Sequence, residues 1–146
     1  MVLTLPYYQK QTPTLNDIPA NTFKGTDPDQ MYINLYIFGT GRPNTTISVL
    51  AYENDASHPI GVNLNQALND KLIYQIGVDW TGWKMVSFKY SGFRKPNTGG
   101  GLGNNRLNPE RLSGLALELD SYSAPGFDVE AYVDMISVTE NGIFQK

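Results

Sequence analysis

The chain has 146 residues, a formal net charge of −3 and no cysteine, and 17% of its residues are charged. A chain of this length is the size of one ordinary domain and needs neither disulfides nor metal to build a core. The missing cysteines exclude thiol catalysis and thiolate metal sites, the scattered Lys and Arg argue against nucleic-acid binding, and no apolar run is long enough to cross a bilayer.

The first third of the chain predicts a lead-in followed by two strands. Residues 1–29 contain four prolines and the turn-like sequence GTDPD, so we expect an irregular lead-in that carries one strand. QMYINLYIF at 30–38 and TTISVLAYE at 45–53 then read as two strands joined by the turn GTGRPN, which favours an antiparallel hairpin. Alternation in the first strand places Met31, Ile33, Leu35 and Ile37 on one face and Tyr32, Asn34, Tyr36 and Phe38 on the other.

Further along the chain the same strand-like pattern recurs. Alternating or β-branched segments follow at 70–79, 83–90, 111–120 and 128–140. Before them, 63–71 is expected to form one helical turn at most. Because Gly, Pro, Asn and Asp separate the segments at intervals of about ten residues, we predict an all-β fold. The sequence therefore predicts a single domain over 1–146, an antiparallel β-sandwich with its core at 30–140.

The order of four segments resembles that of the galactose-binding-like jelly-roll sandwiches found among non-catalytic carbohydrate-binding modules. The segments are ISVLAYEND (47–55), DWTGWKMVSFKYSGF (79–93), LNPERLSGLALELDS (107–121) and EAYVDMISV (130–138). In such modules a strand ending in an acidic turn precedes a Gly-Trp-Lys strand and a phenylalanine corner, and a tyrosine–valine–aspartate strand closes the fold. The resemblance covers about residues 31–140 and connects to secreted polysaccharide-degrading enzymes and to surface lipoproteins of glycan-foraging bacteria. It implies a location at the cell exterior, with the periplasm as the alternative.

The resemblance also concerns calcium. In relatives the position of Asp134, in YVDMI, often ligates a structural calcium ion, and no other cofactor is implied. The opening strand of such modules usually carries an acidic residue, and VLTLPYYQKQTPTLNDIP has no clear equivalent. A calcium ion takes about six to eight oxygen ligands. Two interpretations of Asp134 therefore stay open, a calcium ligand or a carboxylate that hydrogen-bonds the backbone at a bulge.

Sugar recognition needs flat aromatic faces for the C–H side of a pyranose, with amides and carboxylates for its hydroxyls. Outward positions on the expected strands supply these types, although an ordinary solvent-facing sheet shows the same pattern. The first-ranked candidate ligand-binding residues are Tyr32, Asn34, Tyr36, Gln75, Trp80 and Glu118. The second-ranked candidates are Tyr52, Lys89 and Asp120.

The chain has two tryptophans, three residues apart. Strand alternation places Trp83 on the face of Met85 and Ser87, and the resemblance implies that this Trp of Gly-Trp-Lys packs as structure at the sandwich edge. Trp80 lies in the turn-like DWTG, where Gly82 frees the backbone. Binding residues concentrate in loops, so Trp80 is expected either to contact the ligand or to cap the end of the sandwich.

Enzymatic chemistry has weaker support. The glycine-rich stretch 97–105 lacks the following helix and the Gly-Lys-Ser/Thr of a phosphate loop. His58 is the only histidine, and the sequence contains no Gly-x-Ser-x-Gly nucleophile elbow whose serine it could activate. Glu118 and Asp120 share a strand face at a spacing of about 7 Å, which falls within the range of separations between the two catalytic carboxylates of glycosidases. However, a chain this short leaves little room for the deep cleft of such an enzyme.

We therefore expect a non-catalytic module whose partner is a polysaccharide or oligosaccharide, with no nucleic acid and no membrane span. One alternative is a structural or protein-interaction sandwich that packs against neighbouring domains of a longer chain, because β-sandwiches host many unrelated functions. The second alternative is a small glycosidase that uses Glu118 and Asp120.

Overall fold

The computed structural model describes residues 2–5, 14–16, 22–53, 70–96, 106–121 and 129–142. For residues 2–5, 14–16, 120, 121 and 129 it describes the backbone alone. The expected helical turn at 63–71 lies outside the described residues except for its last two positions, which begin a strand. Within the described ranges no helix is long and apolar enough to span a membrane.

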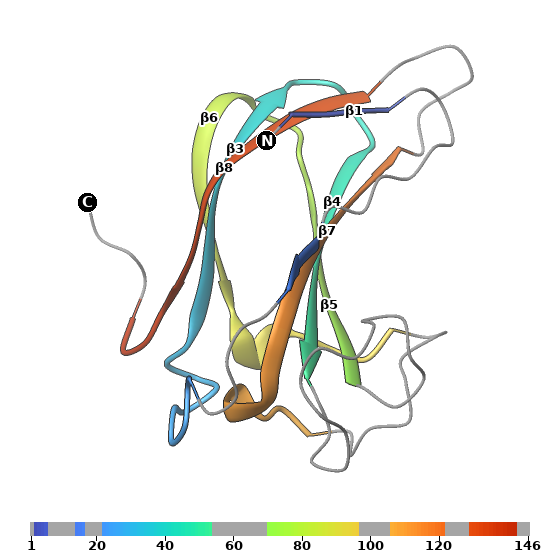
Figure 1. The fold of residues 1–146 in the computed structure, drawn as a ribbon. Helices are drawn as coiled ribbons and strands as arrows, with labels where there is room; N and C mark the ends of the chain where they lie inside the picture. The colour runs from blue at the N-terminus through green and yellow to red at the C-terminus, as the bar shows by residue number, and fades with distance from the viewer. Residues whose placement is uncertain are drawn as a thin grey trace.

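Eight strands in the described residues form two antiparallel sheets of four strands each (Figure 1). Sheet A has the order β1-β8-β3-β6 and sheet B the order β2-β7-β4-β5. The strands are β1 (Val2–Leu5), β2 (Thr14–Asn16), β3 (Tyr32–Thr40), β4 (Thr45–Glu53), β5 (Asp70–Gly77), β6 (Thr81–Lys89), β7 (Leu112–Ser121) and β8 (Val129–Thr139). There are also two single-turn 3₁₀ helices. The first, η1 (Tyr90–Gly92), directly follows β6, and the second, η2 (Pro109–Arg111), directly precedes β7. The six strands predicted from alternation are β3 to β8, and the lead-in 1–29 supplies two strands rather than one.

The predicted hairpin between the first two long strands is wrong. β3 pairs with β6 and β8 in sheet A, whereas β4 pairs with β5 and β7 in sheet B. The chain changes sheets in the turn between them, where Gly41 and Asn44 adopt positive φ angles of 73° and 62°. Alternation is the same for strands that pair side by side and for strands that face each other across a core, so it did not distinguish the two arrangements.

The core lies between the inner faces of the two sheets. Ile33, Leu35 and Ile37 of β3 are fully buried, as the alternation predicted. They belong to one cluster with buried residues of β4, β5, β6, β7 and β8, including Ile47, Val49, Leu72, Phe88, Leu115, Leu117, Leu119 and Val133. Each such side chain contributes about 1.5–3 kcal/mol when it is removed from water, so this cluster dominates the stability of the sandwich.

A buried carboxylate joins three segments at the end of β4. Glu53 is 2% exposed, and its Oε1 accepts hydrogen bonds from the Tyr90 hydroxyl at 2.6 Å and the Asn108 backbone N–H at 2.7 Å. Its Oε2 accepts a third from the Asn108 side-chain amide at 3.3 Å. Burial raises the pKa of Glu53 and the charge of Asp70 adds to the rise, against the opposing effect of these hydrogen bonds. Glu53 thereby ties β4 to η1 and to the segment that enters η2.

A β-bulge interrupts the pairing of β8 with β3. The register shifts between Asn34 and Tyr36, and opposite this shift Met135 adopts a φ of 51°. The Oδ1 atom of Asp134 accepts a hydrogen bond from the Met135 backbone N–H at 2.8 Å. The interpretation of Asp134 as a carboxylate that bonds the backbone at a bulge is therefore confirmed. A calcium ion at Asp134 remains a prediction, and the described residues contain no group of three or more His, Asp or Glu placed to hold a metal.

The positive φ of Met135 predicts an unusual response to glycine. Glycine within a strand normally costs about 0.5–1 kcal/mol, but at a left-handed position it relieves a steric penalty of about 1–2 kcal/mol. We expect Met135→Gly to keep or raise the free energy of unfolding measured in urea, and the matched Ile136→Gly to lower it by about 1 kcal/mol. Equal losses in the two variants would show that Met135 is not left-handed in solution.

Candidate functional site

The predicted ligand-binding residues lie on opposite sides of the molecule. Tyr32, Asn34, Tyr36 and Lys89 belong to the outer face of sheet A, and Tyr52, Gln75, Glu118 and Asp120 lie at outward positions of sheet B. Trp80 stands in the connection between β5 and β6. Because packed sheets are about 10 Å apart, with side chains projecting on both sides, one glycan cannot contact both sets.

The outer face of sheet A is defined by four rows of side chains across β6, β3 and β8. In strand order these rows are Trp83–Phe38–Tyr132, Met85–Tyr36–Asp134, Ser87–Asn34–Ser137 and Lys89–Tyr32–Thr139. The first row is aromatic, the second mixes aromatic, apolar and acidic groups, and the last two are mostly polar. The surface thus changes from apolar to polar along β3.

The aromatic row is the exposed apolar end of this face. Trp83 is 55% exposed. Its ring centroid lies 5.5 Å from that of Phe38 at an interplanar angle of 68°, and Phe38 lies 5.6 Å from Tyr132 at 85°. Such edge-to-face contacts hold aromatic rings in fixed orientations. The row therefore offers an ordered aromatic surface to a ligand, with the Tyr132 hydroxyl hydrogen-bonded to Glu130.

The expectation that Trp83 is buried as structure is wrong, and Trp80 takes that role. Trp80 packs against the core, and its indole N–H donates to the Ile37 carbonyl oxygen at 3.3 Å. The Lys84 ammonium lies 4.8 Å from the centroid of the Trp80 ring. Strand alternation had placed Trp83 on the face of Met85 correctly. That face is the outer one, so Trp83 projects away from the core.

In the polar rows, Asn34 is engaged in internal hydrogen bonds on both sides. Asn34 is 2% exposed, its Oδ1 accepts from the Ser87 hydroxyl at 2.7 Å, and its Nδ2 donates to the Thr139 hydroxyl at 3.0 Å. Asn34 therefore joins β6, β3 and β8 across the sheet. Its burial and these bonds make it a structural residue of the face rather than a contact surface for a ligand.

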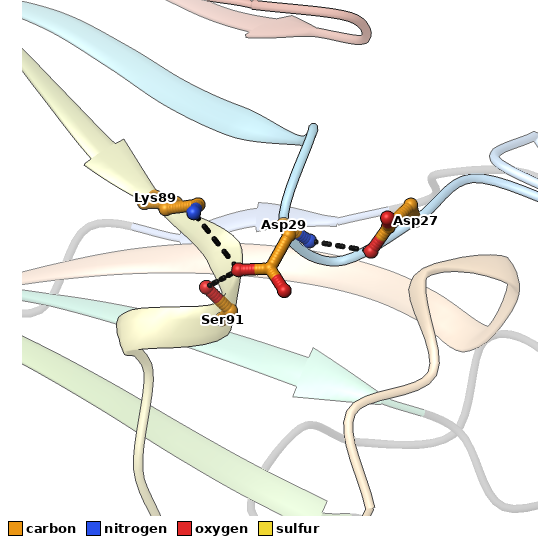
Figure 2. A network of polar contacts seen from close by, with 4 residues as sticks. All are labelled: Asp27, Asp29, Lys89 and Ser91. Atoms are coloured by element: carbon orange, nitrogen blue, oxygen red, sulfur yellow. Dashed lines mark hydrogen bonds and ion pairs between the residues drawn. The ribbon is translucent and has the colours of Figure 1, made fainter.

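An ion pair occupies the far end of the face, beyond the polar rows (Figure 2). The Asp29 carboxylate accepts from the Lys89 ammonium and from the Ser91 hydroxyl, both at 2.8 Å. The Asp29 backbone N–H in turn donates to the carboxylate of Asp27 at 2.8 Å. Hydrogen bonds from Lys89 and Ser91 lower the pKa of Asp29, and the pair raises the pKa of Lys89. Lys89 therefore anchors the segment before β3 to the end of β6.

The outer face of sheet B is less accessible where it is described. Tyr52 is 4% exposed and Glu118 6%, and Lys71 lies 3.7 Å from the Glu118 carboxylate. Burial raises the pKa of Tyr52, and the charge of Glu118 raises it further. Gln75 is exposed and donates to the Ser48 hydroxyl at 3.0 Å. The polar groups of this face are thus largely engaged with one another.

Three sequence-based expectations fall outside the described residues. They concern His58, the glycine-rich stretch 97–105 and the side chain of Asp120, the expected partner of Glu118 in a glycosidase. The glycosidase alternative thus remains a hypothesis. The sequence-based list of ligand-binding residues omitted Trp83, Phe38, Met85 and Tyr132. Alternation had placed Phe38 on the face of Tyr36, and it places Tyr132 on the face of Asp134.

The sheet orders define a jelly-roll β-sandwich, the fold that the sequence resemblance implied. No family model and no curated protein matches the chain. Among solved structures, the chain is similar to a family 11 carbohydrate-binding module from Clostridium thermocellum in complex with a β-1,3-1,4-mixed-linked tetrasaccharide. The TM-score is 0.57 at 15% identity, covering 99% of this chain and 90% of that one.

A second similar structure is the family 11 carbohydrate-binding module of a cellulosomal cellulase from the same organism. Its TM-score is 0.54 at 14% identity, and the match covers 99% of this chain and 91% of that one. Identities this low show a shared fold. The predicted antiparallel jelly-roll sandwich is confirmed by these matches.

Proposed function

We propose that the chain is a non-catalytic carbohydrate-binding module that acts outside the cell and holds a glycan on the outer face of sheet A. The observation that carries the proposal is the ordered aromatic row, with Trp83 more than half exposed, on a sandwich that shares its fold with glycan-binding modules. Binding involves no covalent step.

The chemistry of the face suits a sugar ring. Contiguous apolar patches on the surface of soluble domains mark contact surfaces, and the rings of Trp83, Phe38 and Tyr132 adjoin one another in a single row. A pyranose presents an apolar C–H side, which the Trp83 ring can cover, and a rim of hydroxyls. Tyr36 and Asp134 in the next row supply groups that hydrogen-bond hydroxyls. Adjacent apolar and polar rows thus match the two sides of a sugar.

The choice of sheet A over sheet B rests on exposure. Stacking requires an aromatic face that the ligand can reach, and Tyr52 on sheet B is 4% exposed whereas Trp83 is 55% exposed. Glu118 is similarly buried and lies beside Lys71. A ligand would have to replace these internal contacts on sheet B, whereas the aromatic row is already open.

Affinity gel electrophoresis through a panel of soluble polysaccharides tests the proposal. Mixed-linked β-glucan is the first probe, because one similar module was solved with a tetrasaccharide of that linkage. We expect at least one neutral polysaccharide to retard the chain relative to a non-binding protein of similar charge. Unretarded migration through the whole panel would contradict the proposal and favour a protein-interaction module, whose partner would cover the same aromatic row.

A further inference from the structure

The carboxylate of Asp134 stands in the second row of the outer face of sheet A, next to the aromatic row. Asp134 pairs with Tyr36, which pairs in turn with Met85, and Tyr132 of the aromatic row lies two residues earlier on the same strand. Residues two apart on a strand share a face. Asp134 is exposed. A ligand lying on the aromatic row therefore has this carboxylate beside it.

The backbone holds Asp134 in a fixed position. Its Oδ1 accepts the Met135 N–H at 2.8 Å, within the bulge where Met135 has a φ of 51°. Bulges often re-aim side chains beside binding sites, and a strained backbone conformation in a strand points to a functional constraint. The hydrogen bond fixes the side-chain rotamer before any ligand arrives, and a fixed group loses less conformational entropy on binding.

The charge of this group restricts which glycans fit. An ionised carboxylate only accepts hydrogen bonds, so it suits the hydroxyl donors of a neutral sugar and repels the carboxylate or sulfate of an acidic one. The cation at the far end of the face, Lys89, is bound to Asp29 at 2.8 Å. Glu130, hydrogen-bonded to Tyr132, adds a second negative charge near the aromatic row.

We infer that Asp134 is the specificity-determining residue of this face, selecting neutral glycans by accepting their hydroxyls and excluding uronic-acid-containing and sulfated polymers. This inference rests on the proposed glycan-binding function. In this interpretation the bulge in β8 holds the Asp134 carboxylate in one orientation beside the aromatic row.

The test compares Asp134→Asn and Asp134→Ala with the wild type in gels containing a neutral polymer, the mixed-linked β-glucan, or an acidic one, polygalacturonate. We expect the neutral polymer alone to retard the wild type. Asp134→Ala should weaken neutral binding at least tenfold. Asp134→Asn should keep part of it and gain retardation by polygalacturonate. Glu110→Gln in η2 makes the same change in net charge elsewhere and should behave as wild type.

Several results would overturn the role of Asp134 while leaving the proposed function standing. One is equal retardation of the wild type by both polymers, and another is unchanged neutral binding by Asp134→Ala. A third is loss of wild-type binding in EDTA to the level of Asp134→Ala, because Asp134 would then act through a bound cation. A wild type that no polymer retards would overturn the function and the inference together. Matching circular dichroism spectra keep loss of folding separate from loss of binding.

Discussion

Glu53→Ala is expected to lower the free energy of unfolding by about 3 kcal/mol. The substitution leaves the Tyr90 hydroxyl and two N–H groups of Asn108 without their acceptor, and a buried donor that loses its partner costs about 1–3 kcal/mol. Urea denaturation measures the loss. Glu53→Gln, which keeps a carbonyl acceptor, should lose only about 1 kcal/mol. Equal losses in the two variants would show that packing, and not the hydrogen bonds, makes Glu53 important.

Glu53 also predicts a pH dependence. Its pKa in the folded protein is raised above the ordinary value of 4.5, chiefly by burial. The folded state therefore binds the proton more tightly than the unfolded state. This contribution to stability is full below pH 4.5 and is lost as the pH rises through the raised pKa. The stability of the wild type relative to Glu53→Gln should thus increase when the pH falls from 7 towards 5, and a constant difference would contradict the raised pKa.

Trp80→Ala is expected to destabilise the fold more than Trp83→Ala. Trp80 packs against the core and donates to the Ile37 carbonyl, so its removal should cost about 2–3 kcal/mol of folding free energy. Trp83 is 55% exposed and contacts Phe38 edge-on, so its removal should cost about 1 kcal/mol at most. Urea denaturation of the two variants measures this contrast.

The losses of glycan affinity should have the reverse order, with the larger loss in Trp83→Ala and the smaller in Trp80→Ala. Aromatic anchors at the centre of a binding surface commonly carry about 2 kcal/mol or more, which corresponds to at least a tenfold loss of affinity. We expect Trp83→Ala to lose binding by this amount, and folded Trp80→Ala at low temperature to retain it. Retained binding by Trp83→Ala would exclude the aromatic row as the contact surface.

Alternation in the sequence was enough to predict which residues of β3 line the core, although outward residues such as Tyr52 and Glu118 on other strands are buried as well. Ile33, Leu35 and Ile37 line the core, and Tyr36 faces outward, because successive residues of a strand point to opposite faces. The jelly-roll fold followed from the order of several loose motifs. Alternation does not reveal which sheet a strand joins, since that depends on partners far away in the chain. The pairing of β3 with β8 is an example.

The same limit explains the mixed outcome at the candidate site. Outward residues were identified on each strand, but Tyr36 belongs to sheet A and Gln75 to sheet B, so one predicted surface became two. The position of Trp83 on the face of Met85 followed from alternation, and only the structure shows that this face is open. A bulge at Asp134 was one of two interpretations that the sequence left open, because a bulge depends on a register shift against β3 that the sequence of β8 does not encode alone.

The most direct test of the binding surface is a two-dimensional NMR titration of the ¹⁵N-labelled chain with the glycan that retards it in gels. The side-chain N–H signals of Trp80, Trp83 and Gln75 report the core, the outer face of sheet A and the outer face of sheet B. Our account predicts that the Trp83 indole signal shifts with the ligand, together with backbone signals near Phe38 and Asp134, while the Trp80 and Gln75 signals stay in place. Shifts at Gln75 and along β4 and β7 with an unmoved Trp83 signal would contradict it and place the glycan on sheet B.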